Sequence, residues 1–233
     1  MTERKQTARI AGGLYLGVVA TGLYSLMYVP NQLIDYNDAA TTFQRITQQE
    51  YLYRTGIVAG LFCYGFFLFL PLALYKLFKD VHTNMAQLMV LLAIISVPMY
   101  FINAQNQFSV LSLIGPSAGE MDATSATKAA QVLGYLDQYR VGMRLIHIFS
   151  GLWLFPFGWL VYRSGFLPKF FGVLLMLGCF GYLTNFLLGV LMPGYAGLGV
   201  STYISLPASI GEISICLWLL LAGARKSVMP ANA

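Results

Sequence analysis

Six stretches of the chain are apolar enough to cross a lipid bilayer as helices. A helix rises ~1.5 Å per residue, so about 20 apolar residues span the ~30 Å hydrocarbon core. The stretches lie at residues 10–28, 55–75, 85–104, 144–162, 170–192 and 203–222. The pattern predicts an all-α membrane protein, a bundle of six transmembrane helices that forms a single transmembrane domain over residues 1–233.

The connection between the fourth and fifth stretches has the features of a tight membrane hairpin. Its sequence, Arg163-Ser-Gly-Phe-Leu-Pro-Lys169, has a cation at each end, a glycine suited to a turn and a proline that can start the next helix. We therefore expect this turn to lie on the cytoplasmic side.

The polar segments between the spans also carry helix signals. Asp38 can cap a short surface helix, and Glu50 and Arg54 stand four residues apart, which favours an ion pair. Segment 115–139 has apolar residues at helical spacing, which predicts an amphipathic surface helix before the fourth span.

Two features mark the second and third spans. Pro71 and Pro98 each remove a backbone hydrogen bond, which within a bundle predicts a kink rather than the end of a helix. Residues 103–107 are rich in amide side chains, which favours an interfacial rim, with a pocket wall as the alternative.

A stripe of small residues runs along the first span, at Gly13, Gly17, Thr21 and Ser25. Small residues let helix backbones approach closely where lipid gives no hydrophobic driving force. The stripe favours packing within the chain. A contact between copies through Gly13 and Gly17 is the alternative, so the oligomeric state stays open.

Composition agrees with a membrane protein and leaves no second soluble domain. The chain is 58% hydrophobic and only 10% charged, against roughly 25% charged for soluble domains. Its net charge of +5 comes from cations dispersed at helix ends, which argues against a nucleic-acid partner. The first apolar run shows no cleavage site, so we expect a retained helix rather than a signal peptide.

The cysteines Cys63, Cys179 and Cys216 all lie in apolar stretches without paired or metal-ligand spacing. We expect small packing residues, no disulfide framework, no metal and no cofactor.

The distribution of lysine and arginine predicts the orientation. With both termini in the cytoplasm (N-in/C-in), nine of the fourteen cations lie inside, as the positive-inside rule requires. They are Arg4, Lys5, Arg9, Lys76, Lys79, Arg163, Lys169, Arg225 and Lys226.

Polar groups inside the spans gather in the half of the bundle that this topology places outside. Ionisable groups in a membrane cost roughly 2.5–3.5 kcal/mol on insertion scales, so they face the interior and find partners. They predict a polar pocket open to the outside, or, as the alternative, a hydrogen-bond lock between helices. The candidate ligand-binding residues are Glu212, His147, Arg144, Arg140, Asn185, Tyr182 and Arg54.

A weak internal repeat accompanies this arrangement. Tyr53-Arg54-Thr55-Gly56 matches Tyr139-Arg140-Val141-Gly142, and both copies stand at the outer entry to a span. A parallel duplication would explain the match, and so would shared chemistry at helix ends.

The common catalytic motifs do not occur. The sequence has no HExxH, no GxSxG and no second histidine in a span for a bis-histidine haem. We assign no catalytic residues and favour a role other than catalysis.

Several segments resemble the bacterial domain-of-unknown-function family 4386. They are GWLVYRSGFLPKFFGVLL at 158–175, ARIAGGLYL at 8–16, YRTG at 53–56, GEI at 211–213 and LWLL at 217–220. The likeness covers nearly the whole chain, and the YRSGFLP turn is its most specific motif. The resemblance implies a six-helix inner-membrane protein and carries no activity or catalytic residues.

Together these features predict a multi-pass protein of a bacterial plasma membrane that binds a small or lipid-like molecule in an outward-facing pocket. Such a protein is a substrate-binding or transport component. The alternatives are a structural or regulatory membrane partner and an enzyme that modifies a lipid or quinone.

Overall fold

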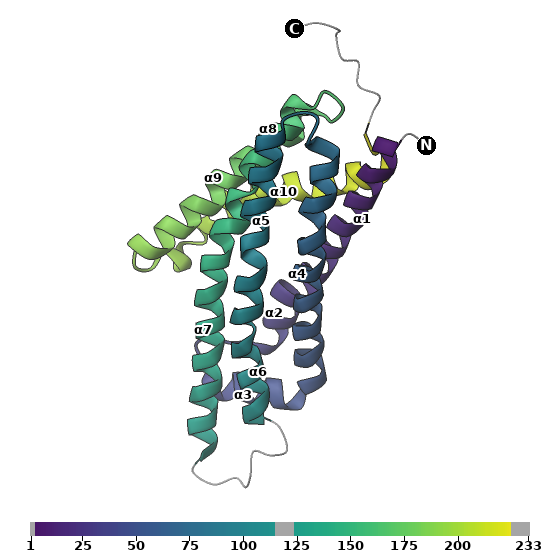
Figure 1. The fold of residues 1–233 in the computed structure, drawn as a ribbon. Coiled ribbons are helices and arrows are strands. Elements are labelled where there is room, and N and C mark those ends of the chain that lie inside the picture. The colour runs from purple at the N-terminus through teal and green to yellow at the C-terminus, as the bar shows by residue number, and fades with distance from the viewer. Residues whose placement is uncertain (1–2, 115–123, 225–233) are drawn as a thin grey trace, which may run out of the picture. The chain divides into compact units, whose positions relative to one another are not determined.

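A computed structural model describes residues 3–114 and 124–224, and every regular element in these ranges is helical (Figure 1). Asp122, in the predicted surface helix, and the cations Arg225 and Lys226 lie outside the described residues. The elements are α1 (Glu3–Leu23), the π-helix η1 (Tyr24–Tyr28), α2 (Val29–Leu33), α3 (Ala39–Gln48), α4 (Glu50–Phe78), α5 (Thr83–Asn103), α6 (Gln105–Ile114), α7 (Thr124–Leu152), α8 (Leu154–Arg163), α9 (Lys169–Leu191), the 3-10 helix η2 (Tyr195–Leu198) and α10 (Val200–Leu221).

Six helical segments of the described chain are long and apolar enough to cross a membrane, which confirms the predicted number. They are Glu3–Leu33, Glu50–Phe78, Thr83–Ile114, Ser125–Arg163, Lys169–Leu191 and Val200–Leu221. The protein is therefore an all-α, multi-pass membrane protein. Segment 115–139 is helical from Thr124, and its helix continues without interruption into the fourth span.

Proline explains where helices continue and where they change. Helices α4 and α5 run through Pro71 and Pro98, as predicted. Pro156 has no N–H and its ring crowds the carbonyl four residues earlier, at Leu152, which is where α7 ends. Pro30 likewise cannot donate to the turn before it, and the helix widens there, so the Val29 N–H donates to the Tyr24 carbonyl five residues back.

The chain divides into two compact units. Unit 1 comprises Met1–Gly17, Phe66–Val97 and Leu145–Ala233, and unit 2 comprises Val18–Gly65 and Pro98–Arg144. The boundaries fall within α1, α4, α5 and α7. The single domain predicted from the sequence stays a prediction.

Aromatic side chains form the centre of unit 1. Trp153 is 1% exposed. Its ring centroid lies 5.1 Å from that of Phe67, 5.2 Å from that of Phe157 and 6.3 Å from that of Tyr15. Residues of α1, α4 and α8 thus meet at one indole.

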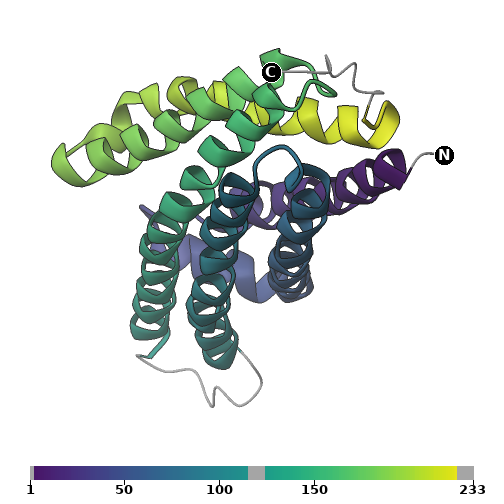
Figure 2. The same ribbon diagram turned by 45° about the horizontal axis from the view of Figure 1, so that its top comes forward.

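The last helices of unit 1 pack through small residues. Helix α9 packs against α8 and α10, and α9 and α10 form an antiparallel pair (Figure 2). A β-carbon at Gly158 of α8 would lie 2.6 Å from the Gly172 carbonyl oxygen of α9, so only glycine allows this approach. The turn between them has Gly165 at φ 69°, as the sequence predicted, and buries Phe166 and Leu167.

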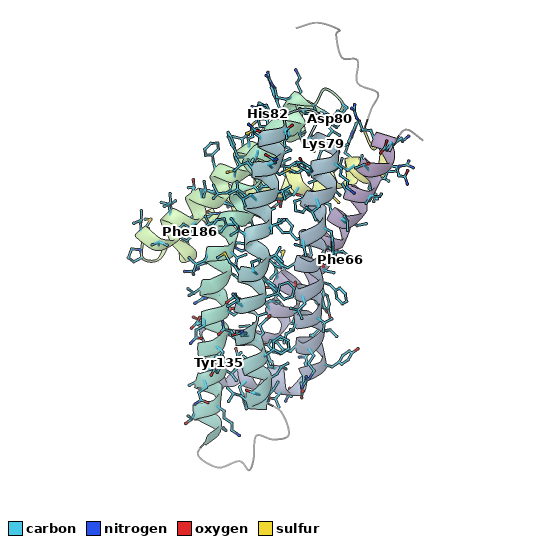
Figure 3. All side chains as sticks on the ribbon, in the orientation of Figure 1. Phe66, Lys79, Asp80, His82, Tyr135 and Phe186 are labelled. Carbon is cyan, nitrogen blue, oxygen red and sulfur yellow. The ribbon has the colours of Figure 1, made fainter. Side chains whose placement is uncertain are left out.

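One end of unit 1 collects cations over aromatic rings. Arg163 lies over Trp159 at 5.5 Å, and Arg4 lies over Phe166 at 5.1 Å. His82 meets the Trp159 ring edge-on at 5.2 Å, and Figure 3 shows it beside Lys79 and Asp80 at the α4–α5 turn. The Arg9 guanidinium donates to the Leu221 carbonyl at the end of α10. The described segments that the cation count assigns to the cytoplasm therefore share one end.

The orientation itself gives a testable prediction. Reporter fusions after Lys79, Lys169 and Lys226 should report cytoplasm, and fusions near Gln48 and Ala126 should report the outside, because lysine and arginine resist translocation. Alkaline phosphatase and fluorescent-protein activities measure the two sides. A reversal at any of these sites contradicts the six-span N-in/C-in topology.

Unit 2 has its own apolar core. Val29, Leu33, Ile46, Tyr53, Ile57, Val110, Val132 and Leu136 form one buried cluster. Asp38 caps α3 by accepting from the Thr41 N–H, as predicted, and hydrogen bonds from Thr41 lower the pKa of its carboxyl. The Arg54 Nε donates to Glu50 Oε1 at 2.6 Å, which confirms that ion pair.

The small stripe on α1 is only partly a packing face. Gly17 meets the Phe66 ring of α4, as predicted, but a β-carbon at Gly13 would touch nothing within 4 Å in the part of the chain that the structure describes. Gly12 makes the close contact instead, since a β-carbon there would lie 2.5 Å from the Leu220 backbone nitrogen of α10. The expectation of a contact within the chain is therefore wrong at Gly13.

Candidate functional site

Glu212 is the centre of a polar cluster in unit 1. It lies midway along α10 and is partly buried. Its carboxyl interacts with the hydroxyl groups of Tyr15 on α1 and Tyr182 on α9. Helices α1 and α9 thus each bring a tyrosine hydroxyl to the carboxyl of α10.

Tyr15 belongs to this cluster and was not among the predicted site residues. Its side chain is 2% exposed. Its hydroxyl lies beside the Glu212 carboxyl, although their geometry falls outside that of an ordinary hydrogen bond. A buried hydroxyl whose hydrogen bond is poorly formed costs free energy. This pair is therefore suited to bind a further polar group.

His147 extends the cluster to α7. Its ring centroid lies 6.0 Å from that of Tyr182, with the planes tilted by 42°. The histidine remains exposed at the surface of the described chain. Tyr182 therefore lies against His147 and interacts electrostatically with Glu212. A direct contact between His147 and Glu212 stays a prediction.

Asn185, also in unit 1, is held by hydrogen bonds to its neighbours. Its Nδ2 donates to the Ser201 carbonyl at 3.0 Å and to Ser205 Oγ at 2.8 Å, and its Oδ1 accepts from the Tyr195 hydroxyl. These bonds tie α9 to η2 and to the start of α10.

The three predicted arginines belong to unit 2. Arg54 pairs with Glu50, and Arg140 donates to Asp137 Oδ1 at 2.7 Å while lying over the Tyr36 ring at 4.2 Å. Arg144 is exposed. Their participation in one site with Glu212 stays a prediction.

Unit 2 contains a small cavity that the sequence analysis did not assign as a site. Its volume is about 30 Å³, and Tyr53, Gln107 and Tyr139 are among the residues that line it. Gln107 comes from the amide-rich segment for which a pocket wall was the alternative to a rim. The repeated Tyr-Arg-x-Gly motif was the sequence signal for Tyr53 and Tyr139.

The family model described as Domain of unknown function (DUF4386) matches residues 10–223. The chain therefore belongs to this family, which confirms the resemblance seen in the YRSGFLP turn and the flanking segments.

A relative from Archaeoglobus fulgidus, described as an uncharacterized protein, is 37% identical over 82 residues. The match covers 35% of this chain and 46% of the relative, so the chain spans less than half of the archaeal protein. No solved structure matches the chain.

Proposed function

We propose that this membrane protein binds a small or lipid-like molecule through the polar cluster around Glu212. The observation that carries the proposal is the convergence of Glu212, Tyr15 and Tyr182 inside unit 1, with His147 against Tyr182. Ionisable residues within a membrane mark functional sites by default, because their insertion is costly.

The chemistry of the cluster selects a ligand with a hydrogen-bonding head and an apolar body. Tyrosine hydroxyls donate and accept, and a glutamate accepts when charged and donates when protonated. The surroundings are apolar and aromatic, with Trp153 and Phe157 packed against Tyr15. A neutral or cationic head beside Glu212 and a hydrocarbon body against these rings fit this arrangement.

In the orientation that the cation count favours, the site would open to the outside of a bacterial plasma membrane. A substrate-binding or transport component is the role that needs such a site.

A packing lock is the second candidate, and one contact favours it. The Cys216 thiol, one turn after Glu212, lies 3.7 Å from the Gly12 carbonyl oxygen, so α1 and α10 are tightly packed beside the cluster. In this role Glu212 and Tyr15 would fix the helices and bind nothing.

The variant Glu212→Gln separates these functions. It keeps the shape of the side chain and its ability to form hydrogen bonds, while replacing one oxygen by an NH2 group and removing the charge. We expect folding to be retained and a co-purifying small molecule or lipid to be lost. Native mass spectrometry and solvent extraction of the purified protein measure the bound molecule, and thermal unfolding in detergent measures stability.

Asp80→Asn is the matched control, because Asp80 is an exposed carboxylate at the turn between α4 and α5, outside the cluster. It should leave the bound molecule in place. If the wild-type protein carries no molecule, or if Glu212→Gln lowers the thermal midpoint without changing what is bound, the packing lock is correct.

A further inference from the structure

The cavity of unit 2 is lined by residues of several helices. Its wall includes Ser25 of the π-helix η1, Pro30 of α2, Tyr53 of α4, Gln107 of α6 and Tyr139 of α7. Single π-turns recur at functional sites because they widen a helix and alter its side-chain directions. Here Pro30 imposes that change, and both Ser25 and Pro30 line the cavity.

Two residues of the wall carry buried oxygens without partners. Tyr53 is 2% exposed and Gln107 is 8% exposed. Within the described part of the chain, neither Tyr53 Oη nor Gln107 Oε1 makes a hydrogen bond. A buried polar atom without a partner costs about 1–3 kcal/mol, so two of them in the wall of one cavity require a third group.

The repeated Tyr-Arg-x-Gly motif builds this cavity from both of its copies. Tyr53 and Tyr139 are both buried in its wall. Each following arginine faces outward and pairs with an acid one turn earlier, Arg54 with Glu50 and Arg140 with Asp137.

The glycine of each copy permits a close helix contact. A β-carbon at Gly56 would lie 2.8 Å from the Val29 side chain, and one at Gly142 would overlap Asn103. In each copy the tyrosine lines the cavity and the arginine faces outward. The glycine three residues after the tyrosine makes a close contact with a neighbouring helix. The recurrence of all three roles shows that the motif specifies the surroundings of the cavity and not only the ends of two spans.

The remaining walls favour a neutral occupant. Burial raises the pKa of Tyr36, although Arg140 above its ring opposes the rise, so this hydroxyl stays protonated at neutral pH. An anion would face Gln107 Oε1, which repels it. A cation could donate to the tyrosine oxygen but would leave the hydroxyl proton without an acceptor. The occupant must donate to Gln107 Oε1 and accept from Tyr53 Oη.

We propose that this cavity is a binding site for one ordered water molecule, which bridges Tyr53 of α4 and Gln107 of α6. The cavity, of about 30 Å³, is large enough to hold a water molecule, which needs about 10–15 Å³ by the same measure. Water donates and accepts, as the two oxygens require. The site joins the two helices without a direct contact between their side chains, and it is independent of the Glu212 cluster in unit 1.

Tyr53→Phe tests the proposal by the sign of its effect on stability. If water bridges the hydroxyl, the variant loses a hydrogen bond and leaves the water with one partner fewer. We then expect the thermal midpoint in detergent to fall by about 2–4 °C. In a dry cavity the same variant removes an unpaired buried hydroxyl, so the midpoint would rise or stay unchanged, and that result overturns the proposal.

A double-mutant cycle with Gln107→Met tests the bridge itself. Both single variants remove one partner of the same water. The thermal midpoint of the double variant should therefore be only slightly lower than that of either single variant. If the decreases in thermal midpoint of the two single variants simply add in the double variant, no molecule couples the two side chains. The controls are Tyr51→Phe, whose tyrosine is 81% exposed on α4, and Gln105→Met on the exposed side of α6; neither should change the midpoint.

An experimental structure that orders water provides the second measurement, and it serves even if a variant does not fold. Density between Tyr53 Oη and Gln107 Oε1, within hydrogen-bond reach of both, supports the site. A direct hydrogen bond between the two side chains, or no density between them, rejects it.

Discussion

Replacing Gly12 by alanine is expected to destabilise the protein markedly. A β-carbon at this position would lie 2.5 Å from the Leu220 backbone nitrogen and 2.7 Å from its α-carbon. Backbone atoms cannot rotate away as a side chain can, so α1 and α10 must separate. Overpacking of this kind costs about 1–3 kcal/mol or more, and each kcal/mol lowers the thermal midpoint by about 2–4 °C at this chain length.

Gly13→Ala is the matched control, one residue further along the same helix. Among the described residues, no atom lies within 4 Å of a β-carbon there, and alanine favours the helix by about 0.8–1 kcal/mol over glycine. Its thermal midpoint in detergent should be unchanged or slightly higher than that of the wild type. Equal losses for the two variants would contradict the packing of α1 against α10. A change in oligomer size with Gly13→Ala alone would identify Gly13 as a contact between copies.

This pair of glycines also shows what the sequence could not predict. The stripe from Gly13 to Ser25 advances in steps of four residues, and each step rotates about 40° on a helix of 3.6 residues per turn. A stripe with this period cannot keep facing one neighbour. Gly17 and Ser25 reach packed surroundings, while Gly13 has rotated away and Gly12 has taken its place.

The six spans could be predicted because lipid imposes a simple rule. Every backbone polar group must be satisfied within its segment, so long apolar runs become helices. The ends were less predictable: the first span was placed at 10–28, and its helical segment runs over Glu3–Leu33. Polar residues continue a helix beyond the membrane at little cost, and hydropathy does not register them.

The candidate site was predictable where it depends on charge and not where it depends on aromatic residues. Glu212 was identified because a carboxylate within a span is costly, and the structure surrounds it with polar groups. Tyr15 was missed, since a tyrosine in an apolar run resembles a packing residue until its partner is known. Tyr53 and Tyr139 were noticed only as parts of a repeat, because helical spacing does not indicate that two distant segments share a cavity.

Replacing Asn185 by leucine is expected to give the second large loss of stability. Its amide joins the Ser201 carbonyl, Ser205 Oγ and the Tyr195 hydroxyl. Leucine has similar volume but satisfies none of them, and a membrane interior supplies little water in exchange. We expect a loss of about 1–3 kcal/mol from the bonds removed, measured as a lower thermal midpoint in detergent.

Thr184→Val is the control for this variant, because Thr184 is the exposed neighbour on α9. The measurement also distinguishes two roles for Asn185. The sequence analysis predicted a ligand-binding residue, whereas the hydrogen bonds of its side chain tie α9 to η2 and α10. If Asn185→Leu keeps the wild-type midpoint but loses the co-purifying molecule, the amide serves the ligand. If the midpoint falls and the molecule is retained by the folded fraction, Asn185 fixes the α9–α10 pair, and the binding cluster reduces to the groups around Glu212.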